Sequence, residues 1–371
     1  MRHRIIAINL PQFHPFKEND EWWGRGFTEW FNVVKARPRF RGHYQPHLPA
    51  DTGFYDLRLP EARQMQADMA RKYGIYGFCY YHYWFNGKQL MERPVNEILK
   101  SGEPDFPFML CWANENWTKA WDGLNKDILI QQNYSNEDDI EHMRWLCKNV
   151  FSDKRYIRVD GKPVFAVYRI ELFPDFSKTV ETWRMIAKKE FGMELYLINA
   201  RFRLSPQGKN ALSLGLDASY DFQPFDLDKV YDIPRYRYIK SILWRIPWFN
   251  KQPFYKKRLN RLPLVGSYPR YVEEMKKQPM PNYKLFPCVC PSWDNSARRV
   301  GKTFYALANS TPLCFGEWLR DTLKRFVPYS KDENFVFINA WNEWAEGNHL
   351  EPDQKWGTAY LEEVKKAVEN D

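Results

Sequence analysis

The 371-residue sequence lacks the signatures of several protein classes. It has no run of about 18 apolar residues, so no segment is predicted to cross a membrane as a helix. Its six cysteines include no CxxC pair and no zinc-finger spacing, which argues against a redox dithiol and a zinc finger. A glycine-rich phosphate loop and a G-x-S-x-G nucleophile elbow are also missing, which excludes the enzymes built on those motifs.

The chain also lacks a signal-peptide pattern, because a predicted strand begins almost at once, at residue 5. Cys79, Cys111 and Cys288 fall in predicted strands, where a free cysteine behaves as a small apolar residue. Both features predict a cytoplasmic protein in a reducing compartment.

Aromatic residues are abundant: they make up 17% of the chain, with 16 Trp and 22 Tyr. Trp and Tyr are seldom fully buried, so a core alone does not require so many. A large aromatic core and a carbohydrate-binding surface both fit this composition. For the rings at predicted strand ends we favour the surface.

The order of apolar and amphipathic stretches predicts a (β/α)₈ barrel, one domain over residues 1–371, with a doubly wound sheet as the alternative. Eight strands are expected at residues 5–9, 75–83, 108–113, 163–168, 195–199, 218–220, 286–289 and 335–340. Seven helices are expected at residues 57–72, 93–100, 136–150, 179–191, 271–277, 316–326 and 357–369. Three long segments, residues 11–56, 114–134 and 221–268, follow strands and would lie at the C-terminal face, where barrel active sites form.

The third of these segments, residues 221–268, is predicted to be a basic aromatic insertion. Between Lys229 and Leu262 there are ten basic residues and one acid, Asp232, a net charge of +9 that equals that of the whole chain. An ordinary solvated insertion explains this charge. The functional alternative is contact with the inner-membrane surface or a lipid-linked glycan, which makes the protein peripheral to that membrane. Nucleic acid is not predicted, because no binding motif accompanies the charge.

Five predicted strand ends combine aromatic rings with amide, hydroxyl or carboxylate groups. Sugars are bound in this way, because their CH faces stack on rings and their hydroxyls hydrogen-bond to polar side chains. The sequence therefore predicts an oligosaccharide or polysaccharide substrate. The predicted substrate-binding residues are Gln12, His14, Tyr81, His82, Tyr83, Trp84, Trp112, Asn114, Glu115, Trp293, Asp294, Trp341, Asn342 and Trp344.

Glu343 and Glu346 are the predicted catalytic pair. They follow the last predicted strand, three residues apart among tryptophans, so their Cβ atoms can lie roughly 5–6 Å apart. Glycoside chemistry uses two carboxyl groups, one protonated and one ionised. The alternative is a pair of surface glutamates on a turn. Glu115 is a further carboxylate candidate, for which anchoring a loop is as good an explanation.

Two weaker patterns suggest metals. Asp226-Leu227-Asp228 has the D-x-D form by which many nucleotide-sugar transferases hold a metal, but three residues match easily by chance. His43 and His47 have ligand spacing without an obvious third ligand, so structural or substrate-contacting roles are favoured. No metal or cofactor is predicted.

Several long motifs resemble the WbsX-type family, which is associated with O-antigen and capsule gene clusters and is usually described as glycosyltransferases. The resemblance extends over nearly the whole chain. Its motifs are NLPQFHP at residues 9–15, WWGRGFTEW at 22–30, YQPHLP at 44–49, GFCYYHYWF at 77–85 and WANENW at 112–117.

This family is similar to glycoside hydrolase family 99, endo-α-mannosidases and endo-α-mannanases with (β/α)₈ barrels. The segment WNEWAEG at residues 341–347 resembles their catalytic segment, with Ala345 where the hydrolases generally have histidine. The resemblance implies that Glu343 deprotonates the sugar 2-hydroxyl, which attacks the anomeric carbon to form an epoxide-like intermediate. It also implies that Glu346 acts as general acid and then as base.

Three hypotheses follow. The first is a retaining, metal-independent enzyme that cleaves or transfers at an α-mannosidic or related linkage of a polysaccharide. The second is a glycosyltransferase that uses a sugar nucleotide, and the third is a carbohydrate-binding protein without turnover.

Overall fold

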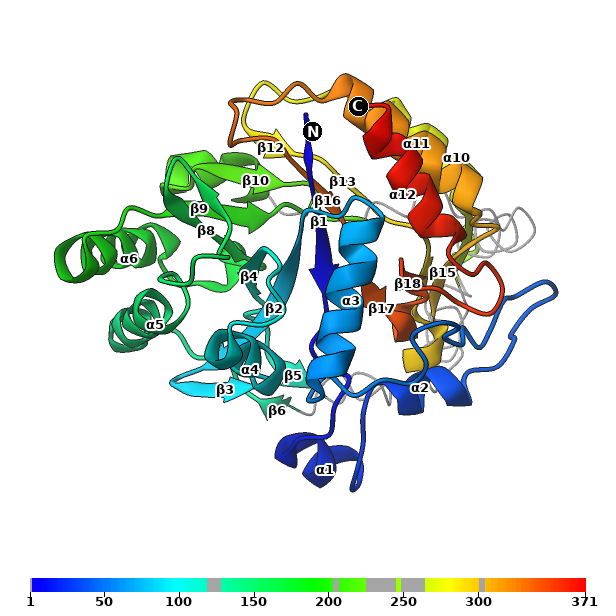
Figure 1. The fold of residues 1–371 in the computed structure, drawn as a ribbon, viewed down its shortest axis with the longest axis horizontal. Coiled ribbons are helices and arrows are strands. Elements are labelled where there is room, and N and C mark those ends of the chain that lie inside the picture. The colour runs from blue at the N-terminus through cyan, green and yellow to red at the C-terminus, as the bar shows by residue number, and fades with distance from the viewer. Residues whose placement is uncertain (1, 119–127, 203–206, 225–244, 248–263, 300–303) are drawn as a thin grey trace.

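The computed structural model describes residues 2–118, 128–202, 207–224, 245–247, 264–299 and 304–371. Within these residues the main sheet is a parallel barrel, and helices cover its outside (Figure 1). Its strands are β1 (Arg4–Asn9), β2 (Gly77–Phe85), β4 (Phe108–Trp112), β8 (Lys162–Val167), β9 (Tyr196–Ala200), β10 (Ala218–Tyr220), β12 (Leu285–Phe286) with β13 (Cys288–Val289), and β16 (Phe335–Ile338). β12 pairs with β10 and β13 with β16, which closes the barrel. The predicted (β/α)₈ barrel is confirmed, and the doubly wound sheet is wrong.

All seven predicted helices are present, with ends that differ from the prediction by a few residues. They are α3 (Pro60–Lys72), α4 (Arg93–Ser101), α5 (Asn136–Asn149), α6 (Phe176–Phe191), α10 (Tyr268–Lys276), α11 (Pro312–Arg325) and α12 (Ala359–Glu369). The start of α5 shows a local signal that makes such a helix predictable. The Ser135 side chain accepts a hydrogen bond from the Asp138 N–H at 3.1 Å, as an N-cap residue does.

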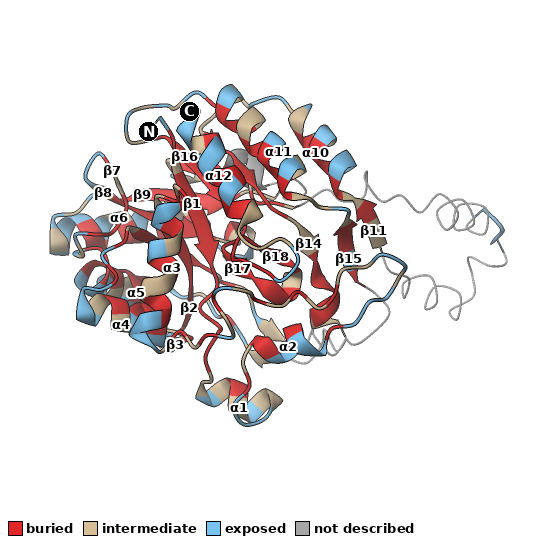
Figure 2. Ribbon diagram, turned by 45° about the vertical axis from the view of Figure 1, so that its right-hand side comes forward, coloured by how far each residue is buried: buried red, intermediate tan, exposed pale blue. Residues whose placement is uncertain are grey.

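The strands are buried on both faces, and the helices expose only their outer faces (Figure 2). Every residue of β2 is buried, including its tyrosines. This is why the strands read as near-continuous apolar runs instead of alternating patterns.

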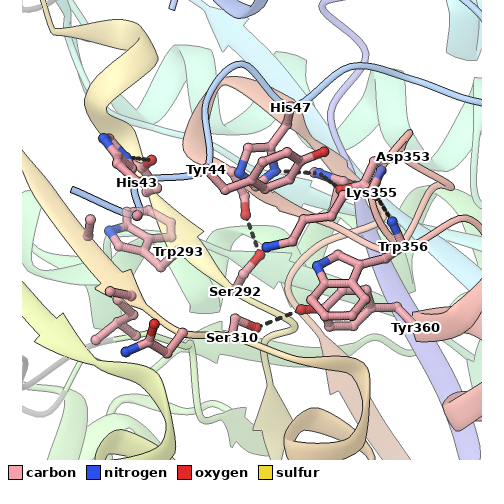
Figure 3. Close-up of a pocket in the computed structure, with 18 of the residues that line it drawn as sticks. His43, Tyr44, His47, Ser292, Trp293, Ser310, Asp353, Lys355, Trp356 and Tyr360 are labelled. Carbon is pink, nitrogen blue, oxygen red and sulfur yellow. Dashed lines mark hydrogen bonds and ion pairs between the residues drawn. The ribbon is translucent and has the colours of Figure 1, made fainter. Parts of the chain in front are cut away.

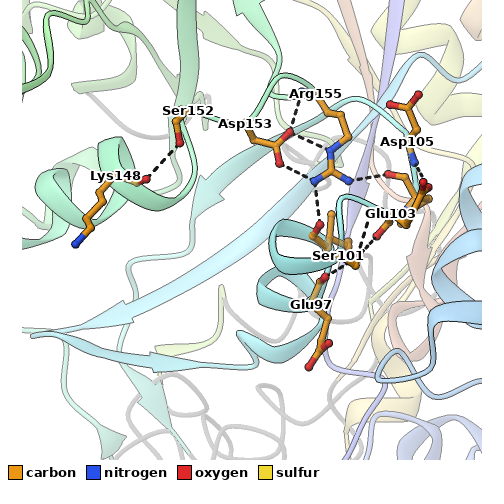
Figure 4. Close-up of polar contacts among 10 residues, drawn as sticks. Glu97, Ser101, Glu103, Asp105, Lys148, Ser152, Asp153 and Arg155 are labelled. Atoms are coloured by element: carbon orange, nitrogen blue, oxygen red, sulfur yellow. Dashed lines mark hydrogen bonds and ion pairs between the residues drawn. The ribbon is translucent and has the colours of Figure 1, made fainter.

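A buried arginine, Arg155, joins the loops at the N-terminal end of the barrel (Figure 4). Its guanidinium donates to the carbonyl oxygens of Pro104 at 3.0 Å and Ile98 at 2.9 Å, and to the Asp153 carboxylate at 2.6 Å. These bonds connect the α4–β4 loop to the segment before β8. In a barrel this end contributes stability, and the opposite end carries the site.

The segment after β1 contains two short helices that were not predicted, α1 (Lys17–Trp23) and α2 (Trp30–Lys35). Short hairpins and a small sheet complete the described part: β3 (Lys88–Leu90), β5 (Trp117–Thr118) with β6 (Ile128–Ile130), β7 (Arg158–Val159), and β11 (Leu264–Ser267) with β15 (Tyr305–Ala308) and β14 (Trp293–Asp294). Sequence periodicity does not reveal elements this short.

The basic stretch between Lys229 and Leu262 lies outside the described residues except for 245–247, and so do Asp226 and Asp228. The described helices were searched for a segment long and apolar enough to cross a membrane, and none qualifies.

Candidate active site

Glu343 and Glu346 lie on a tight turn at the C-terminal end of β16. The turn consists of β17 (Asn342–Glu343), the short helix η6 (Trp344–Glu346) and β18 (Asn348–His349). Gly347 closes it with a φ of 55°, and a Cβ there would lie 3.1 Å from the Asp294 Cβ. The turn therefore requires glycine for its conformation and for its close contact with the neighbouring strand β14.

One guanidinium holds both glutamates. Arg298 donates from Nη2 to Glu343 Oε2 at 2.8 Å and from Nη1 to Glu346 Oε1 at 2.7 Å. Its Nε donates to Glu29 Oε1 at 2.7 Å. Glu29 is fully buried, whereas Glu346 exposes 21% of its side chain. Three carboxyl groups thus surround one buried cation, and Glu346 is the one most open to solvent.

Burial of these carboxyl groups changes their protonation. Burial raises the pKa of Glu343 to about 8, and Arg298 opposes this while Glu346 and Glu29 reinforce it. Burial also raises the pKa of Glu346, again against the effect of Arg298. One guanidinium cannot balance three buried carboxylates, so the pair retains a proton at neutral pH. A protonated and an ionised carboxyl side by side is the arrangement that acid–base chemistry on a glycosidic bond requires.

The short helix η5 (Asn295–Arg298) presents Arg298, and Asp294 fixes that helix. Asp294 Oδ1 accepts from the Ser296 N–H at 2.9 Å, and Oδ2 accepts from His43 Nε2 and Gln45 Nε2, both at 2.6 Å. Burial acts to raise the pKa of Asp294, but the His43 and Gln45 hydrogen bonds hold it below its ordinary value. Because its oxygens are engaged in this way, Asp294 positions the arginine.

Beneath the turn lies another buried glutamate, Glu351. It accepts hydrogen bonds from Trp344 Nε1 at 2.6 Å, Tyr55 Oη at 2.7 Å and Gln66 Nε2 at 2.7 Å. Burial raises its pKa to about 7, and the three donors act against that rise. These contacts tie η6 to α3 and to the segment before it, so Glu351 supports the turn from the barrel side.

The variant Glu351→Gln is expected to lower the free energy of unfolding by about 1–3 kcal/mol. The glutamine amide nitrogen would replace a carboxylate oxygen, so at least one of the three donors would lose its hydrogen-bond acceptor. Urea unfolding followed by tryptophan fluorescence measures the difference. Glu369→Gln is the control, since Glu369 is exposed at the end of α12 and its removal should change little. Equal unfolding midpoints for the two variants would contradict the supporting role.

Tyr81 and Tyr83 of β2 lie in the electrostatic field of Glu343. Burial raises the pKa of both phenols well above the usual value, and Glu343 adds to the rise. Both hydroxyls therefore stay protonated at neutral pH and can donate hydrogen bonds.

A continuous strip of aromatic rings passes through these two tyrosines. Tyr83 meets Trp117 at a centroid distance of 5.5 Å, and Tyr81 meets Tyr168 at 6.0 Å. The strip extends through Trp22 at one end and Phe202 at the other. Its outer rings, those of Trp22, Trp117, Tyr168 and Phe202, are only partly buried. This aromatic strip, defined by these six residues, keeps partly exposed rings at both of its ends.

The structure buries seven other predicted substrate-binding residues. Trp84, His82 and Trp112 pack around the buried His142 between β2, β4 and α5. The others are Asn114, Trp341, Asn342 and Trp344. Asn342 joins β17 to the end of β1, where its Oδ1 accepts from the Leu10 N–H at 2.7 Å. An indole without an exposed face cannot stack on a sugar, so these tryptophans shape the core.

The remaining predicted residues differ in their burial and contacts. Gln12 Nε2 and His14 Nδ1 are buried and find no hydrogen-bond partner among the described residues. Glu115 is paired with Arg169 on the rim. Trp293 is half-buried and lines a separate cavity behind the turn (Figure 3). His43 and His47 do not converge on one point, since His43 bonds to Asp294 and His47 to His349.

Sequence reasoning missed Arg298 and Glu29 entirely. Glu29 immediately precedes α2. Arg298 lies four residues after Asp294, the last residue of that strand end for which a substrate-binding role is predicted. The available signals were the position of Glu29 within the WWGRGFTEW motif and the proximity of Arg298 to the strand-end residue Asp294.

Comparison with known proteins identifies the family. The family "Glycosyltransferase WbsX" matches residues 5–364. Two proteins called "uncharacterized protein WxcX", from Xanthomonas campestris pv. campestris strains B100 and ATCC 33913, are each 38% identical over 365 residues. The match covers 98% of this chain and 49% of each relative, so the chain spans about half of their length.

Solved structures agree on the fold. A GH99 endo-α-mannosidase from Bacteroides thetaiotaomicron in complex with bis-tris-propane has a TM-score of 0.58 at 12% identity, with 100% of this chain and 97% of that chain covered. A second structure of a GH99 endo-α-mannosidase from the same organism gives 0.57 at 14% identity with the same coverage. A "glycoside hydrolase-like protein" gives 0.57 at 16% identity, covering 98% of this chain and 93% of that chain. At such identities the likeness shows the barrel fold. The family match over nearly all of the sequence goes further: this chain belongs to the WbsX glycosyltransferase family.

Proposed function

We propose that this chain is a glycan-active enzyme that cleaves or transfers at an α-mannosidic or related linkage of a bacterial-type surface polysaccharide, with retention and without a catalytic metal. The observation that carries the proposal is the buried Glu343–Arg298–Glu346 arrangement at the end of β16. Two carboxyl groups with raised pKa values share one cation there, next to the aromatic strip.

The reaction needs one carboxylate as base and one carboxylic acid. In the assignment that the resemblance implies, Glu343 takes the proton of the sugar 2-hydroxyl, whose oxygen attacks the anomeric carbon. Glu346 gives a proton to the departing glycosidic oxygen, and its carboxylate then takes the proton of the water or sugar that opens the intermediate. In the same step Glu343 returns its proton to the 2-oxygen, which restores the hydroxyl. In the free protein, burial raises the pKa of both coupled glutamates, that of Glu343 to about 8, so the pair shares one proton. The assignment above needs that proton on Glu346 when the glycosidic oxygen departs, and a proton on Glu343 at that moment exchanges the two roles.

The direct test of the function is incubation of the protein with mannose-containing oligosaccharides and the host polysaccharide, followed by mass spectrometry of the products. Shortened or re-joined oligosaccharides support the proposal. NMR of the first product shows whether the anomeric configuration is retained. No product from any α-mannosidic substrate would overturn the proposed linkage class.

A second candidate is a sugar-nucleotide-dependent glycosyltransferase, which the description of the matching family favours. It predicts that a nucleotide sugar raises the melting temperature beyond the effect of Mn²⁺ alone. A panel of nucleotide sugars with and without Mn²⁺, including a metal-only arm, separates donor binding from metal binding. No added stabilisation by any donor counts against this candidate.

The aromatic strip gives the proposal a second test. Trp117→Ala is expected to raise KM about tenfold with a small change in kcat. Loss of the indole face that stacks on the sugar removes about 1.4 kcal/mol of binding free energy and acts mainly on substrate binding. Trp117→Phe should keep most of the affinity. Trp356→Ala is the matched control, since Trp356 lines the separate cavity of Figure 3. An unchanged KM for Trp117→Ala would remove Trp117 from the substrate site.

A further inference from the structure

Three ligand-type side chains converge behind the catalytic turn (Figure 3). His47 comes from the long segment after β1, His349 from β18, and Asp353 from four residues further on. His47 Nδ1 lies 2.9 Å from His349 Nε2, and His349 Nε2 lies 4.0 Å from Asp353 Oδ2. All three ligand atoms lie within 4.8 Å of one another, and the three residues are buried.

The surrounding contacts orient these atoms toward one another. His349 Nδ1 donates to the Glu351 carbonyl oxygen at 2.9 Å, which leaves the Nε2 lone pair facing His47. His47 Nδ1 therefore carries the proton of the 2.9 Å contact, and to bind an ion His47 must change to the tautomer protonated on Nε2. Asp353 Oδ1 accepts from the backbone N–H groups of Lys355 at 3.0 Å and Trp356 at 2.6 Å. The Tyr44 hydroxyl also hydrogen-bonds to the Asp353 carboxylate, and Asp353 Oδ2 lies 4.0 Å from His349 Nε2. Imidazoles and carboxylates that bind metals are held from behind in this way.

We propose that His47 Nδ1, His349 Nε2 and Asp353 Oδ2 bind a divalent transition metal of the zinc class. Two imidazoles and one carboxylate form a donor set suited to Zn²⁺. With metal–ligand distances of about 2.0–2.1 Å, tetrahedral ligand atoms lie about 3.3 Å apart. The His47–His349 pair must open from 2.9 Å and the His349–Asp353 pair must close from 4.0 Å, each by less than about 1 Å. The third pair, His47 with Asp353, must close from a separation of at most 4.8 Å.

A cavity gives the ion access. It has a volume of about 90 Å³ and is lined on its far side by Ser292, Ser310 and Tyr360. Figure 3 shows Lys355 reaching across the same cavity, with its Nζ 4.6 Å from the Tyr44 ring centroid. This ammonium opposes a second cation, so it sets the affinity below what the three ligands alone would give.

The position of the site indicates a structural role for the metal. His349 pairs with Asn342 across the β17–β18 hairpin, and Glu343 pairs with Asn348. The Trp344 indole stacks on the His349 ring at 3.8 Å. An ion held here would couple the segment around His47 to the turn that carries Glu343 and Glu346. The ion takes no part in the proposed glycoside chemistry.

Metal binding is measured directly, on the untagged 371-residue chain stripped with a chelator and dialysed. Calorimetric titration with Zn²⁺ is expected to give one equivalent bound, and Zn²⁺ should raise the melting temperature. Co²⁺ should give visible absorption typical of nitrogen and oxygen ligands, without a thiolate band. His47→Gln and Asp353→Asn should each weaken binding at least tenfold, with circular dichroism confirming that they fold.

Two further variants keep the test decisive if the histidine variant is unstable. Lys355→Met removes the opposing charge and should tighten Zn²⁺ binding several-fold. Cys314→Ser is the control for adventitious thiol binding, because Cys314 is a half-buried thiol outside the cavity, and it should bind like the parent. Binding below half an equivalent, or equal binding by the parent and Asp353→Asn, would show that the His47–His349 contact is a hydrogen bond only. That outcome would leave the proposed glycan activity untouched, since no enzymatic turnover enters the measurement.

Discussion

Glu343→Gln and Glu346→Gln are each expected to lower kcat on a natural-type oligosaccharide by about 10²–10⁴-fold. Each variant removes a group that transfers a proton in the transition state, and general acid–base catalysis contributes about that much. The amide keeps the size of the side chain and can still accept a hydrogen bond from Arg298, so binding should change less than turnover. The measurement is initial rates over a range of substrate concentrations.

The two variants also decide which glutamate is the acid. A substrate with a nitrophenol or fluoride leaving group needs no proton on that group, so it should restore most of the first step for the variant that lacks the acid. The variant that lacks the base stays inactive on both substrates. Rescue of Glu346→Gln supports the assignment from the resemblance. Rescue of Glu343→Gln alone would show that Glu343 is the acid and Glu346 the base, in keeping with the pKa of about 8 for Glu343.

Glu190→Gln is the matched control, since Glu190 on α6 is a carboxylate that is also paired with an arginine, Arg144, but lies outside the candidate site. It should keep kcat within a few-fold of the parent. Full activity of Glu343→Gln or Glu346→Gln on the natural-type substrate would remove that residue from the chemistry.

Arg298→Met is expected to be the most damaging single substitution at the site. It leaves the buried Glu29 and Glu343 without their cation, and removing one partner of a buried ion pair costs about 3–5 kcal/mol. Arg298→Lys keeps a charge but cannot bind three carboxyl groups in the same fork geometry. The double variant Glu29→Gln/Arg298→Met removes one charge of each sign and should recover part of the stability. Urea unfolding at neutral pH measures all three.

The same substitution should shift the pH dependence of kcat/KM. Arg298 holds the pKa values of Glu343 and Glu346 below what burial alone would produce, so its loss raises both. Catalysis needs one member of the pair ionised, so the acidic limb of the profile should move to higher pH. The loss of activity should therefore be larger at pH 6 than at pH 8. A profile that moves to lower pH, or a stability equal to that of the parent, would contradict the proposed role of Arg298.

The barrel could be predicted because its signals are local. Each strand is an apolar run long enough to be buried on both faces, as in β2 and β16, and each main helix has its own periodicity or cap, as at Ser135. The turn after β16 could also be predicted as a site. The C-terminal end of any strand in a (β/α)₈ barrel is an active-site position, so the neighbouring strands need not be known. The two glutamates were therefore predicted from the sequence, with their function still a proposal.

The surroundings of those glutamates were decided by the tertiary structure alone. Glu29, Arg298 and Glu343 are far apart in the chain, and so are His47 and His349, so no spacing rule connects them. Composition likewise could not separate a tryptophan that is buried, such as Trp112, from one that keeps an open face, such as Trp117, because burial depends on what packs against a ring from elsewhere in the chain. The sequence by itself determined the barrel and the carboxylate turn, whose causes lie within short segments. Only the folded chain decided which cation, which rings and which histidines meet there, because those contacts exist only once the barrel has closed.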